Sequence, residues 1–522
     1  GEGDWSYLQQ ILSPGAQVHL VRVRMQDGLC MPELIIYEPD YLVNVTTVAS
    51  CFETYAESPF VSIINRLKPQ ANTEHIHLGN LTGQFLDDTV HDRDIPFAQS
   101  MTRYFQMNAL EMLACEGFQS QQQAEAFYEK ARAQRANIRK LIGQDLRQSI
   151  ARYDSAHVTL EPTFFSDMLG IQGRLDFLYR HKKQTIIIEQ KSGKGDFVPP
   201  SSPSYDPEVP KPQEKHLVQL LLYRALLTYE FNLHSEELSH IMLLYSRYQQ
   251  GLVSVGQMPA LMLRAIRMRN LLAWCEIHHA QEGYAFLSTL SPEKLNRKQV
   301  GGILWNIYVR PELERLLLPI HQASPLERAY FLRFMQFLAQ ERLLSKVGSK
   351  TKEDAGFASK WLSSLEEKRA AGNIYEGLIL DDFQQDDDGV TGLMARFPQQ
   401  QSADTSNFRR GDIVLLYPYK EHTEPRVCAQ MVIRGSIEDI STEGIRLTLR
   451  NGQTDPKVFA KGSHTYWAIE HDLYDSSIDN LYSGLHRFLC APQERRSLLL
   501  SEREPVTDNS LSLRGDYGAF NN

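Results

Sequence analysis

The chain has 522 residues, 42% hydrophobic and 23% charged, which is the length and composition of a globular protein with two to four domains. Its 55 basic and 64 acidic residues give a net charge of −9, which excludes a uniformly basic nucleic-acid-binding surface but permits a local basic track. No stretch approaches the roughly 18 consecutive apolar residues of a membrane span, so no membrane partner is expected.

The cysteines are scattered and form no CxxC pair, which argues against a disulfide framework or a zinc ribbon and favours a reducing cytoplasm. Because the first residue is Gly and not Met, we expect the chain to be a fragment of a longer protein. The six cysteines are Cys30, Cys51, Cys115, Cys275, Cys428 and Cys490.

The hydrophobic pattern predicts a first domain that begins with strands over 17–50 and continues with helices over 97–151. Acidic and Gln-rich composition then predicts a linker, and short apolar runs with turn residues after it predict a small β-barrel. The expected division is a first domain over 1–285, a helical region over 286–375, a linker over 376–404, a β-barrel over 405–475 and a connector over 476–522.

The stretch over 173–193 alternates with period two on both sides of a polar turn, which predicts a β-hairpin. A turn centred between Lys182 and Lys183 places Phe177 opposite Ile188 and gives the hairpin one coherent apolar face. A slip of one residue would scatter that face, so the register is fixed.

The same register places Asp176 opposite Glu189, where cross-strand Cβ atoms lie about 4.5–5.5 Å apart and like charges repel. Two carboxylates held together favour a divalent cation between them, and oxygen ligands suit Mg²⁺ or Mn²⁺. Lys191 lies on the same face, where its ammonium could orient water or stabilise charge on a phosphorane. The alternative is a solvated strand face, but the three isoleucines before Glu189 favour a buried strand.

A Pro- and Ser-rich loop over 197–213 follows the hairpin, and its position favours a flap that faces the substrate. The next helix sets His216, Gln219 and Tyr223 on one face, at the spacing i, i+3 and i+7.

Three segments resemble, in order, the motifs of RecB-type nucleases of the PD-(D/E)XK superfamily: "GRLD", "EQKSG" and "HLVQLLLY" match G-x-x-D, E-x-K-[ST]-G and H-x-x-Q-x-x-x-Y. The resemblance covers about 35–280 and is closest to the nuclease part of the DNA replication helicase/nuclease family. It implies an α/β fold with a restriction-endonuclease-like core and helical additions, beside the β-barrel.

The resemblance also implies residue roles. Asp176, Glu189 and Lys191 would be catalytic, and the metal would be held by Asp176, Glu189 and the carbonyl of Gln190. His216, Gln219 and Tyr223 would flank the site and bind substrate, although packing of Tyr223 and a structural bond of His216 are equally compatible with the sequence.

The sequence departs from the family pattern at the histidine that usually serves as an extra metal ligand, because "LGNLTGQFLDD" places Gly83 there. Glu161 could substitute, with a surface role on an edge strand as the alternative. Cys51 matches the first iron–sulfur cysteine of many relatives, but only isolated cysteines follow the nuclease motifs, so no cluster is expected.

The family fuses this nuclease to an ATP-driven helicase, but no G-x-x-x-x-G-K-[ST] motif occurs here, so no ATP site is expected in this chain. The barrel segment resembles the barrel near the start of such helicases, which predicts a helicase domain in the same parent chain. The resulting hypothesis is a Mg²⁺- or Mn²⁺-dependent nuclease for single-stranded or flapped DNA. The alternatives are a degenerate fold that binds DNA or a partner without cleavage, and a sequence-specific restriction-type enzyme, for which no recognition motif is found.

Overall fold

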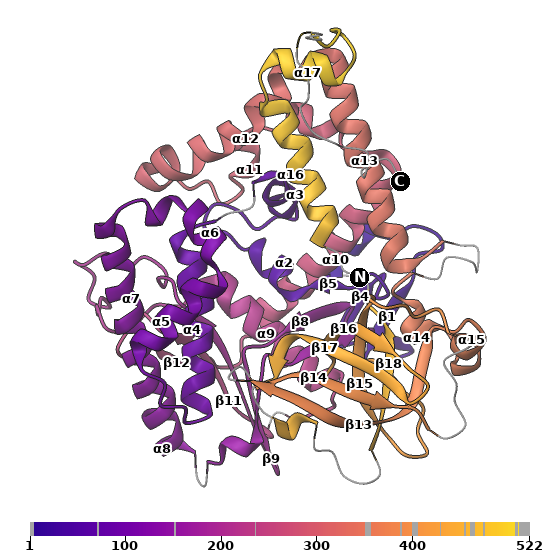
Figure 1. Ribbon diagram of the computed structural model, residues 1–522. Helices are drawn as coiled ribbons and strands as arrows, with labels where there is room; N and C mark the ends of the chain where they lie inside the picture. The colour runs from indigo at the N-terminus through magenta and orange to yellow at the C-terminus, as the bar shows by residue number, and fades with distance from the viewer. Residues whose placement is uncertain are drawn as a thin grey trace.

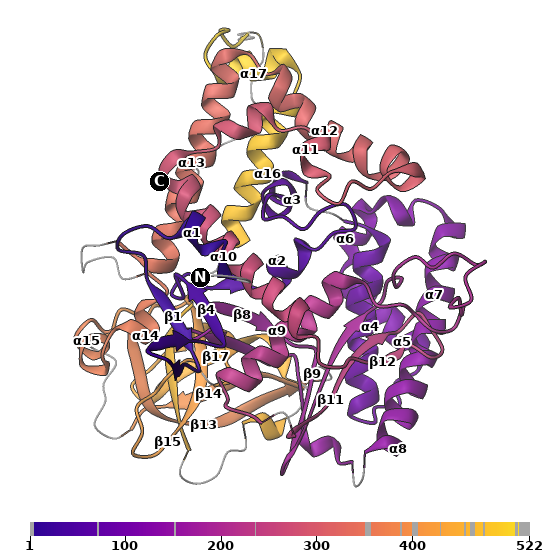
Figure 2. The ribbon, with the colours of Figure 1, turned by 180° about the vertical axis from the view of Figure 1, so that it is seen from behind.

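The structure of the protein is a computed structural model, in which an α/β part, a helical part and a β-barrel pack against one another (Figures 1 and 2). In Figure 1 the helical part lies at the top, the barrel at the lower right and the α/β part at the lower left. The structure describes residues 5–69, 72–150, 153–234, 236–349, 356–386, 389–398, 406–428, 430–453, 456–459, 465–472, 476–506 and 510.

The α/β part is built around a five-stranded sheet with the order β12-β11-β10-β9-β6. Its strands are β6 (Val158–Leu160), β9 (Phe177–His181), β10 (Gln184–Lys191), β11 (Leu238–Tyr245) and β12 (Leu252–Ser254). β10 pairs in parallel with β11 and antiparallel with β9, so it is an interior strand. This position explains its run of three isoleucines, since a strand buried on both faces needs apolar residues on both.

Helices cover both faces of this sheet. On one face, Ile186 and Ile188 pack in a core with α4 (Glu74–Val90) and α7 (Gln121–Lys140). On the other face, Ile187 packs in a core with α2 (Val45–Ser50), α9 (Glu214–Tyr229) and α10 (Pro259–Glu282). Figure 2 shows α9 and α10 on this second face. The residues that follow in β10 therefore point alternately toward α4 and toward α9.

The predicted hairpin register is confirmed. Ile186 pairs with Tyr179, and Ile188 pairs with Phe177, after which the pairing between β9 and β10 ends. The predicted strands near the N-terminus and the predicted helices over 97–151 are also present, whereas α2 forms where an extended segment was expected. The other strands of this part are β1 (Val18–Val21), β2 (Arg24–Gln26), β3 (Leu29–Met31), β4 (Leu34–Tyr37), β5 (Val43–Asn44), β7 (Thr163–Ser166) and β8 (Ile171–Arg174).

The helical part has a core of its own, formed by α3 (Phe60–Leu67), α12 (Arg310–Gln322), α13 (Pro325–Val347) and α16 (Ser476–Cys490). Its helical character over 286–375 agrees with the prediction. Two of its predicted boundaries differ from the structure. The core of the helical part includes α3, which was predicted in the first domain, and α16, which was predicted in the connector. The remaining helices are α1 (Leu8–Ile11), α5 (Phe97–Met107), α6 (Ala109–Ala114), α8 (Arg147–Ser149), α11 (Pro292–Leu295), α14 (Ser359–Leu362), α15 (Leu365–Ala370) and α17 (Gln493–Leu499).

The barrel is closed, with the strand order β13-β14-β17-β16-β15-β18. Its strands are β13 (Ile374–Asp386), β14 (Gly389–Arg396), β15 (Ile413–Lys420), β16 (Ile433–Ile440), β17 (Gly444–Gln453) and β18 (Thr465–His471). β13 and β14 show that the linker predicted over 376–404 is wrong for most of its length, and residues 399–405 lie outside the described residues.

The error in the linker has a physical cause. Asp382 and Gln384 of β13 are exposed to solvent, while Leu378, Val390 and Leu393 point into the core of the barrel. The register of β13 shifts after Asp381, and the residues from Asp382 to Gln385 are all exposed, so the composition of this part of the strand resembles that of a polar linker. The composition of this segment therefore predicted a linker where two strands form.

The barrel is joined to the α/β part by a backbone hydrogen bond and by an apolar interface. The Val432 amide donates to the Thr163 carbonyl over 2.9 Å, which continues the small β5-β8-β7 sheet toward the barrel. Phe165 and Tyr417 are both fully buried in this interface.

Arg269 on α10 holds the N-terminal segment to the α/β part. The Arg269 side chain is completely buried, and burial lowers its pKa to about 9. Its guanidinium donates to the carbonyls of Gly170, Glu38 and Tyr41 over 2.8–2.9 Å, and to that of Tyr37. Gly170 is required here, because its φ is +61° and a Cβ would overlap the guanidinium.

We expect Arg269→Met to lower the free energy of unfolding by at least about 3 kcal/mol, because it leaves several buried carbonyls without donors. Urea unfolding followed by circular dichroism measures the change. Arg267→Met is the matched control, since Arg267 lies exposed on the same helix, and it should change the free energy by about 1 kcal/mol or less. Equal losses in both variants would contradict this role of Arg269.

Candidate active site at the end of the hairpin

A cavity of about 470 Å³ opens where β10 ends. It is bounded by α4, by the ends of β8 and β10, and by the first turn of α9. Three carboxylates line the cavity and are called here its acidic side: Asp87, Glu161 and Asp176. Four basic side chains also line it and are called here its basic side: Arg174, Lys191, Lys194 and Lys215. The two groups meet where Arg174 pairs with Glu161, and together they suit a cation and the phosphate that it binds.

Glu189 is the most buried charged group of the site, with 3% of its surface exposed. Its Oε1 accepts hydrogen bonds from the Lys191 ammonium over 2.8 Å and from the Gln219 amide over 2.5 Å. Its Oε2 is buried without a hydrogen-bond partner. The Lys191 ammonium also donates to Gln219 Oε1 over 2.9 Å, so the three side chains form a closed triangle.

Asp176 lies at the break between β8 and β9, where the ladder with β10 has ended. Its Oδ2 accepts from the Gln190 amide over 2.6 Å, so a side chain takes the place of the missing backbone partner. Burial first, and then the neighbouring Asp176 carboxylate, raise the pKa of Glu189 to about 8. The predicted proximity of these two carboxylates is therefore seen in the structure.

The residues present fit a divalent cation. Glu189 Oε2 is an unpaired buried oxygen beside a second carboxylate, and such an atom costs free energy unless it finds a partner. Two carboxylates plus water and substrate phosphate are the usual protein environment of Mg²⁺. Within the described residues, no group of three or more His, Cys, Asp or Glu side chains is arranged to hold a metal ion. A third protein ligand, such as the Gln190 carbonyl, stays a prediction.

The three residues predicted on α9 lie in different environments. Gln219 contacts both Lys191 and Glu189. His216 lines the cavity and bonds to the Tyr245 hydroxyl over 2.8 Å, and burial with Lys191 and Lys215 lowers its pKa to about 3. Tyr223 is buried, and its hydroxyl donates to the Arg174 carbonyl over 2.6 Å. Tyr223 therefore packs against the end of β8, as in the packing alternative, and its predicted contact with substrate stays a prediction.

The cavity also shows the surroundings of position 83, where the family pattern has a histidine and this chain has Gly83. Gly83 on α4 lines the cavity, and a Cβ built there would meet no atom within 4 Å. Asp87 lies one helical turn after Gly83 on α4 and was not predicted as a site residue. Burial first, and then the neighbouring Glu161 carboxylate, raise the pKa of Asp87. Glu161, the predicted substitute, lies beside Asp176 and pairs with Arg174 over 3.2 Å. The spacing of four residues from Gly83 was the signal that could have identified Asp87.

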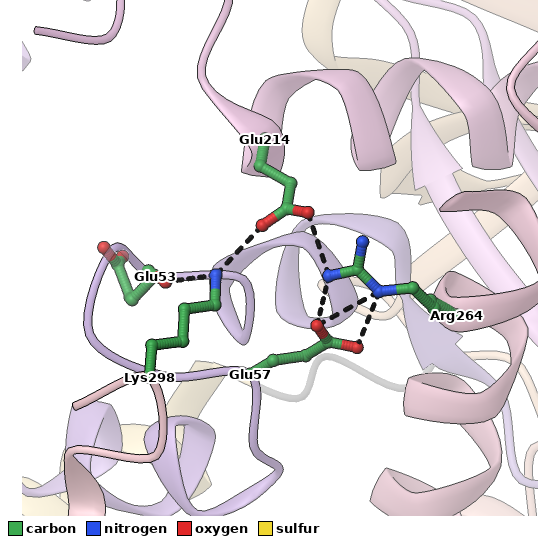
Figure 3. Close-up of polar contacts among 5 residues, drawn as sticks. All are labelled: Glu53, Glu57, Glu214, Arg264 and Lys298. Carbon is green, nitrogen blue, oxygen red and sulfur yellow. Dashed lines mark hydrogen bonds and ion pairs between the residues drawn. The ribbon is translucent and has the colours of Figure 1, made fainter. Parts of the chain in front are cut away.

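A network of ion pairs fixes the first turn of α9 against its neighbours (Figure 3). Glu214 contacts Arg264 over 2.9 Å and Lys298 over 3.0 Å. Arg264 also contacts Glu57, and the Lys298 ammonium donates to the Glu53 carbonyl. This network holds the end of α9 that brings Lys215 and His216 to the cavity.

The remaining expectations concern cysteines and membranes. Cys51, Cys275 and Cys428 are buried as free thiols, and Cys490 is an exposed one. The expected absence of an iron–sulfur cluster stays a prediction. Among the described residues, none of the helices combines the length and the apolar character needed to cross a membrane.

A mixed sheet between two helical layers, with two acids and a lysine at the end of its central hairpin, defines the class of PD-(D/E)XK nuclease folds. The comparison with protein families agrees, because residues 49–296 match the PD-(D/E)XK nuclease superfamily, and this part of the chain is a domain of that superfamily. The predicted fold class is thus confirmed, including a separate closed barrel. No curated protein matches the chain.

The raised pKa of Glu189 predicts how pH affects the metal-free protein. Its pKa is about 8 in the folded protein and 4.5 in the unfolded chain, so its stabilising contribution is fully present below pH 4.5 and is lost as pH rises through about 8. In EDTA, the free energy of unfolding should therefore fall between pH 5 and pH 8 by on the order of a few kcal/mol, as measured by urea unfolding.

Glu189→Gln should remove most of this loss, because the amide does not titrate. The control is Glu129→Gln, since Glu129 is exposed on α7 and should leave the pH dependence unchanged. A Glu189→Gln protein that keeps the full pH dependence would show that another group is responsible.

Gly83→His should strengthen Mn²⁺ binding by about tenfold, because an imidazole at this position can enter the cavity beside the acidic side. Isothermal titration calorimetry measures the affinity. Gly83→Ala controls for the gain in helix propensity. Equal affinity in the two variants would mean that a side chain at position 83 does not reach the metal.

Proposed function

We propose that this protein is a Mg²⁺- or Mn²⁺-dependent nuclease that hydrolyses phosphodiester bonds of single-stranded or flapped DNA. One observation carries the proposal: Asp176, Glu189 and Lys191 converge at the end of one hairpin, and a buried oxygen of Glu189 has no partner. A domain of a nuclease superfamily and a cavity with an acidic and a basic side support it.

The roles of the residues follow from their contacts. Asp176 and Glu189 would hold the cation, and Gln219 and Lys191 fix the orientation of the Glu189 carboxylate. When bound, the cation supplies a polarised phosphate and an activated water. The Lys191 ammonium, held between Glu189 and Gln219, is placed to stabilise negative charge on the phosphate in the transition state. His216, neutral at pH 7 because of its low pKa, can donate or accept a hydrogen bond without adding charge.

The biological context is part of the same proposal. We assign the chain to a helicase-nuclease of replication or repair, with the helicase domain in the same parent chain and a cytoplasmic location. The order of the three RecB-type motifs and the barrel beside the nuclease domain support this assignment. The basic side of the cavity supplies the local positive charge that a protein with a net charge of −9 needs for DNA.

The alternative is a degenerate nuclease fold that binds DNA or a partner without cleaving it, which the glycine at position 83 permits. The arrangement favours cleavage, because two neighbouring carboxylates offer ligands for a cation and the Lys191 ammonium beside them offers positive charge for a phosphate.

Asp176→Ala and Lys191→Ala should each lower Mn²⁺- or Mg²⁺-dependent cleavage of labelled single-stranded DNA by at least about a hundredfold. Asp176→Ala removes a metal ligand, and Lys191→Ala removes the charge that faces the phosphate. EDTA should abolish cleavage by the wild-type protein. Gel electrophoresis of the products under single-turnover conditions measures the rates.

Two matched variants act as controls, because they remove the same charges outside the cavity. Asp94→Ala removes a carboxylate whose side chain is 97% exposed, and Lys183→Ala removes an exposed lysine from the turn of the same hairpin. Both should cleave at the wild-type rate. DNA binding without any metal-dependent cleavage would favour the degenerate fold, and cleavage that survives both site substitutions would refute the assignment of the site.

A further inference from the structure

The loop between β10 and α9 frames the mouth of the cavity. Its first residues, Ser192 to Lys194, line the cavity directly after the catalytic strand. Its far end returns to the same cavity with Gln213, Lys215 and His216. Both ends of the loop therefore lie at the proposed reaction centre, and the loop borders the cavity that a strand of nucleic acid would enter.

The two sides of the loop are tied together at a narrow neck. The Asp196 amide donates to the Lys211 carbonyl over 2.6 Å, and the Lys211 ammonium pairs with the Asp196 carboxylate over 2.7 Å. Gly195 makes this closure possible, because a Cβ at this position would lie 2.5 Å from the Lys211 carbonyl oxygen. The Gln213 side chain adds a bond to the Lys194 carbonyl over 2.8 Å.

Phe197 is the first residue beyond this neck. Its amide donates to Asp196 Oδ1 over 3.0 Å, which fixes its backbone, while 78% of the residue is exposed. Pro199 and Pro200 follow and restrict the chain on its other side. The neck and the prolines restrict the backbone of Phe197. A ligand that covers the ring therefore loses little binding free energy to ordering of this backbone.

We infer that Phe197 forms a base-stacking subsite for single-stranded nucleic acid, next to the catalytic cavity. The inference rests on the proposed nuclease function and adds to it the residue that selects unpaired strands. Phe197 comes six positions after Lys191, which is at most about 21 Å of extended chain, so one bound strand reaches both.

The chemistry of the subsite specifies an unpaired base. An aromatic ring stacks on the face of a base, and every base offers such a face once it leaves a duplex. Inside a duplex these faces are covered by neighbouring base pairs, so Phe197 finds a free face only at the terminal pairs. Exposed apolar side chains are common on proteins, but Phe197 lies only three residues beyond Lys194, which lines a cavity that carries several basic side chains.

Charge gives a second reason for a stacking contact. With a net charge of −9, the protein repels the phosphate backbone outside the local basic side of its cavity. Stacking adds affinity that does not depend on counterion release. A protein of this charge gains selectivity for single strands if part of its affinity comes from an aromatic contact.

The test compares binding of a labelled single-stranded oligonucleotide and of a blunt duplex with the same sequence, with Ca²⁺ in place of Mg²⁺, by fluorescence anisotropy. Phe197→Ala should weaken single-strand binding by about tenfold and leave duplex binding unchanged. The slope of log Kd against log salt concentration should stay the same, because no phosphate contact is lost. Phe197→Trp should bind single strands at least as tightly as the wild type.

Phe337→Ala is the matched control, because Phe337 is 48% exposed on α13, and it should bind both DNAs like the wild type. Unchanged single-strand binding by Phe197→Ala, or equal losses on both DNAs, overturns the stacking subsite. A wild-type protein that cleaves single strands while Phe197→Ala binds them normally overturns the subsite alone. A wild-type protein that neither binds nor cleaves either DNA overturns the proposed function and the subsite together.

Discussion

The site depends on one buried carboxylate. Glu189 follows the three isoleucines of β10 in a sheet that is covered on both faces, so it is almost completely buried, and Lys191 and Gln219 donate to one of its oxygens. The other oxygen is left without a hydrogen bond, close to the carboxylate of Asp176. Burial of such a group is unfavourable unless a cation or a proton joins it. The surrounding strands and helices keep the two carboxylates close together in spite of this cost.

Three features of the fold maintain it. β10 pairs on both sides, so the strand cannot shift and carry Glu189 out to solvent. The break after β8 turns Asp176 inward, where its side chain accepts the Gln190 amide that β9 no longer pairs. The ion pairs of Glu214 with Arg264 and Lys298 hold the start of α9, and with it Gln219, against the strand.

The candidate site was largely predictable, and the rest of the architecture was less so. The hairpin register and the proximity of Asp176, Glu189 and Lys191 follow from residues close together in the sequence, whereas their roles stay predictions. Asp87 was missed because α4 lies far away in the sequence, and only folding brings it across from Asp176. Tyr223 shares a helix face with Gln219, but β8 packs over its hydroxyl, which a helical spacing cannot reveal.

The sequence by itself determined the central hairpin, its register and the pair of acids at its end, because alternation with period two acts between neighbouring residues and leaves one arrangement that buries the isoleucines. The tertiary structure alone decided which strands close the barrel, where α3 and α16 are buried, and which side chains from α4 and α9 face the acids. These depend on contacts between segments far apart in the chain. Local pattern carries no information about such contacts. A polar strand such as β13 has the same composition as a polar linker, and only its pairing with a neighbouring strand distinguishes it.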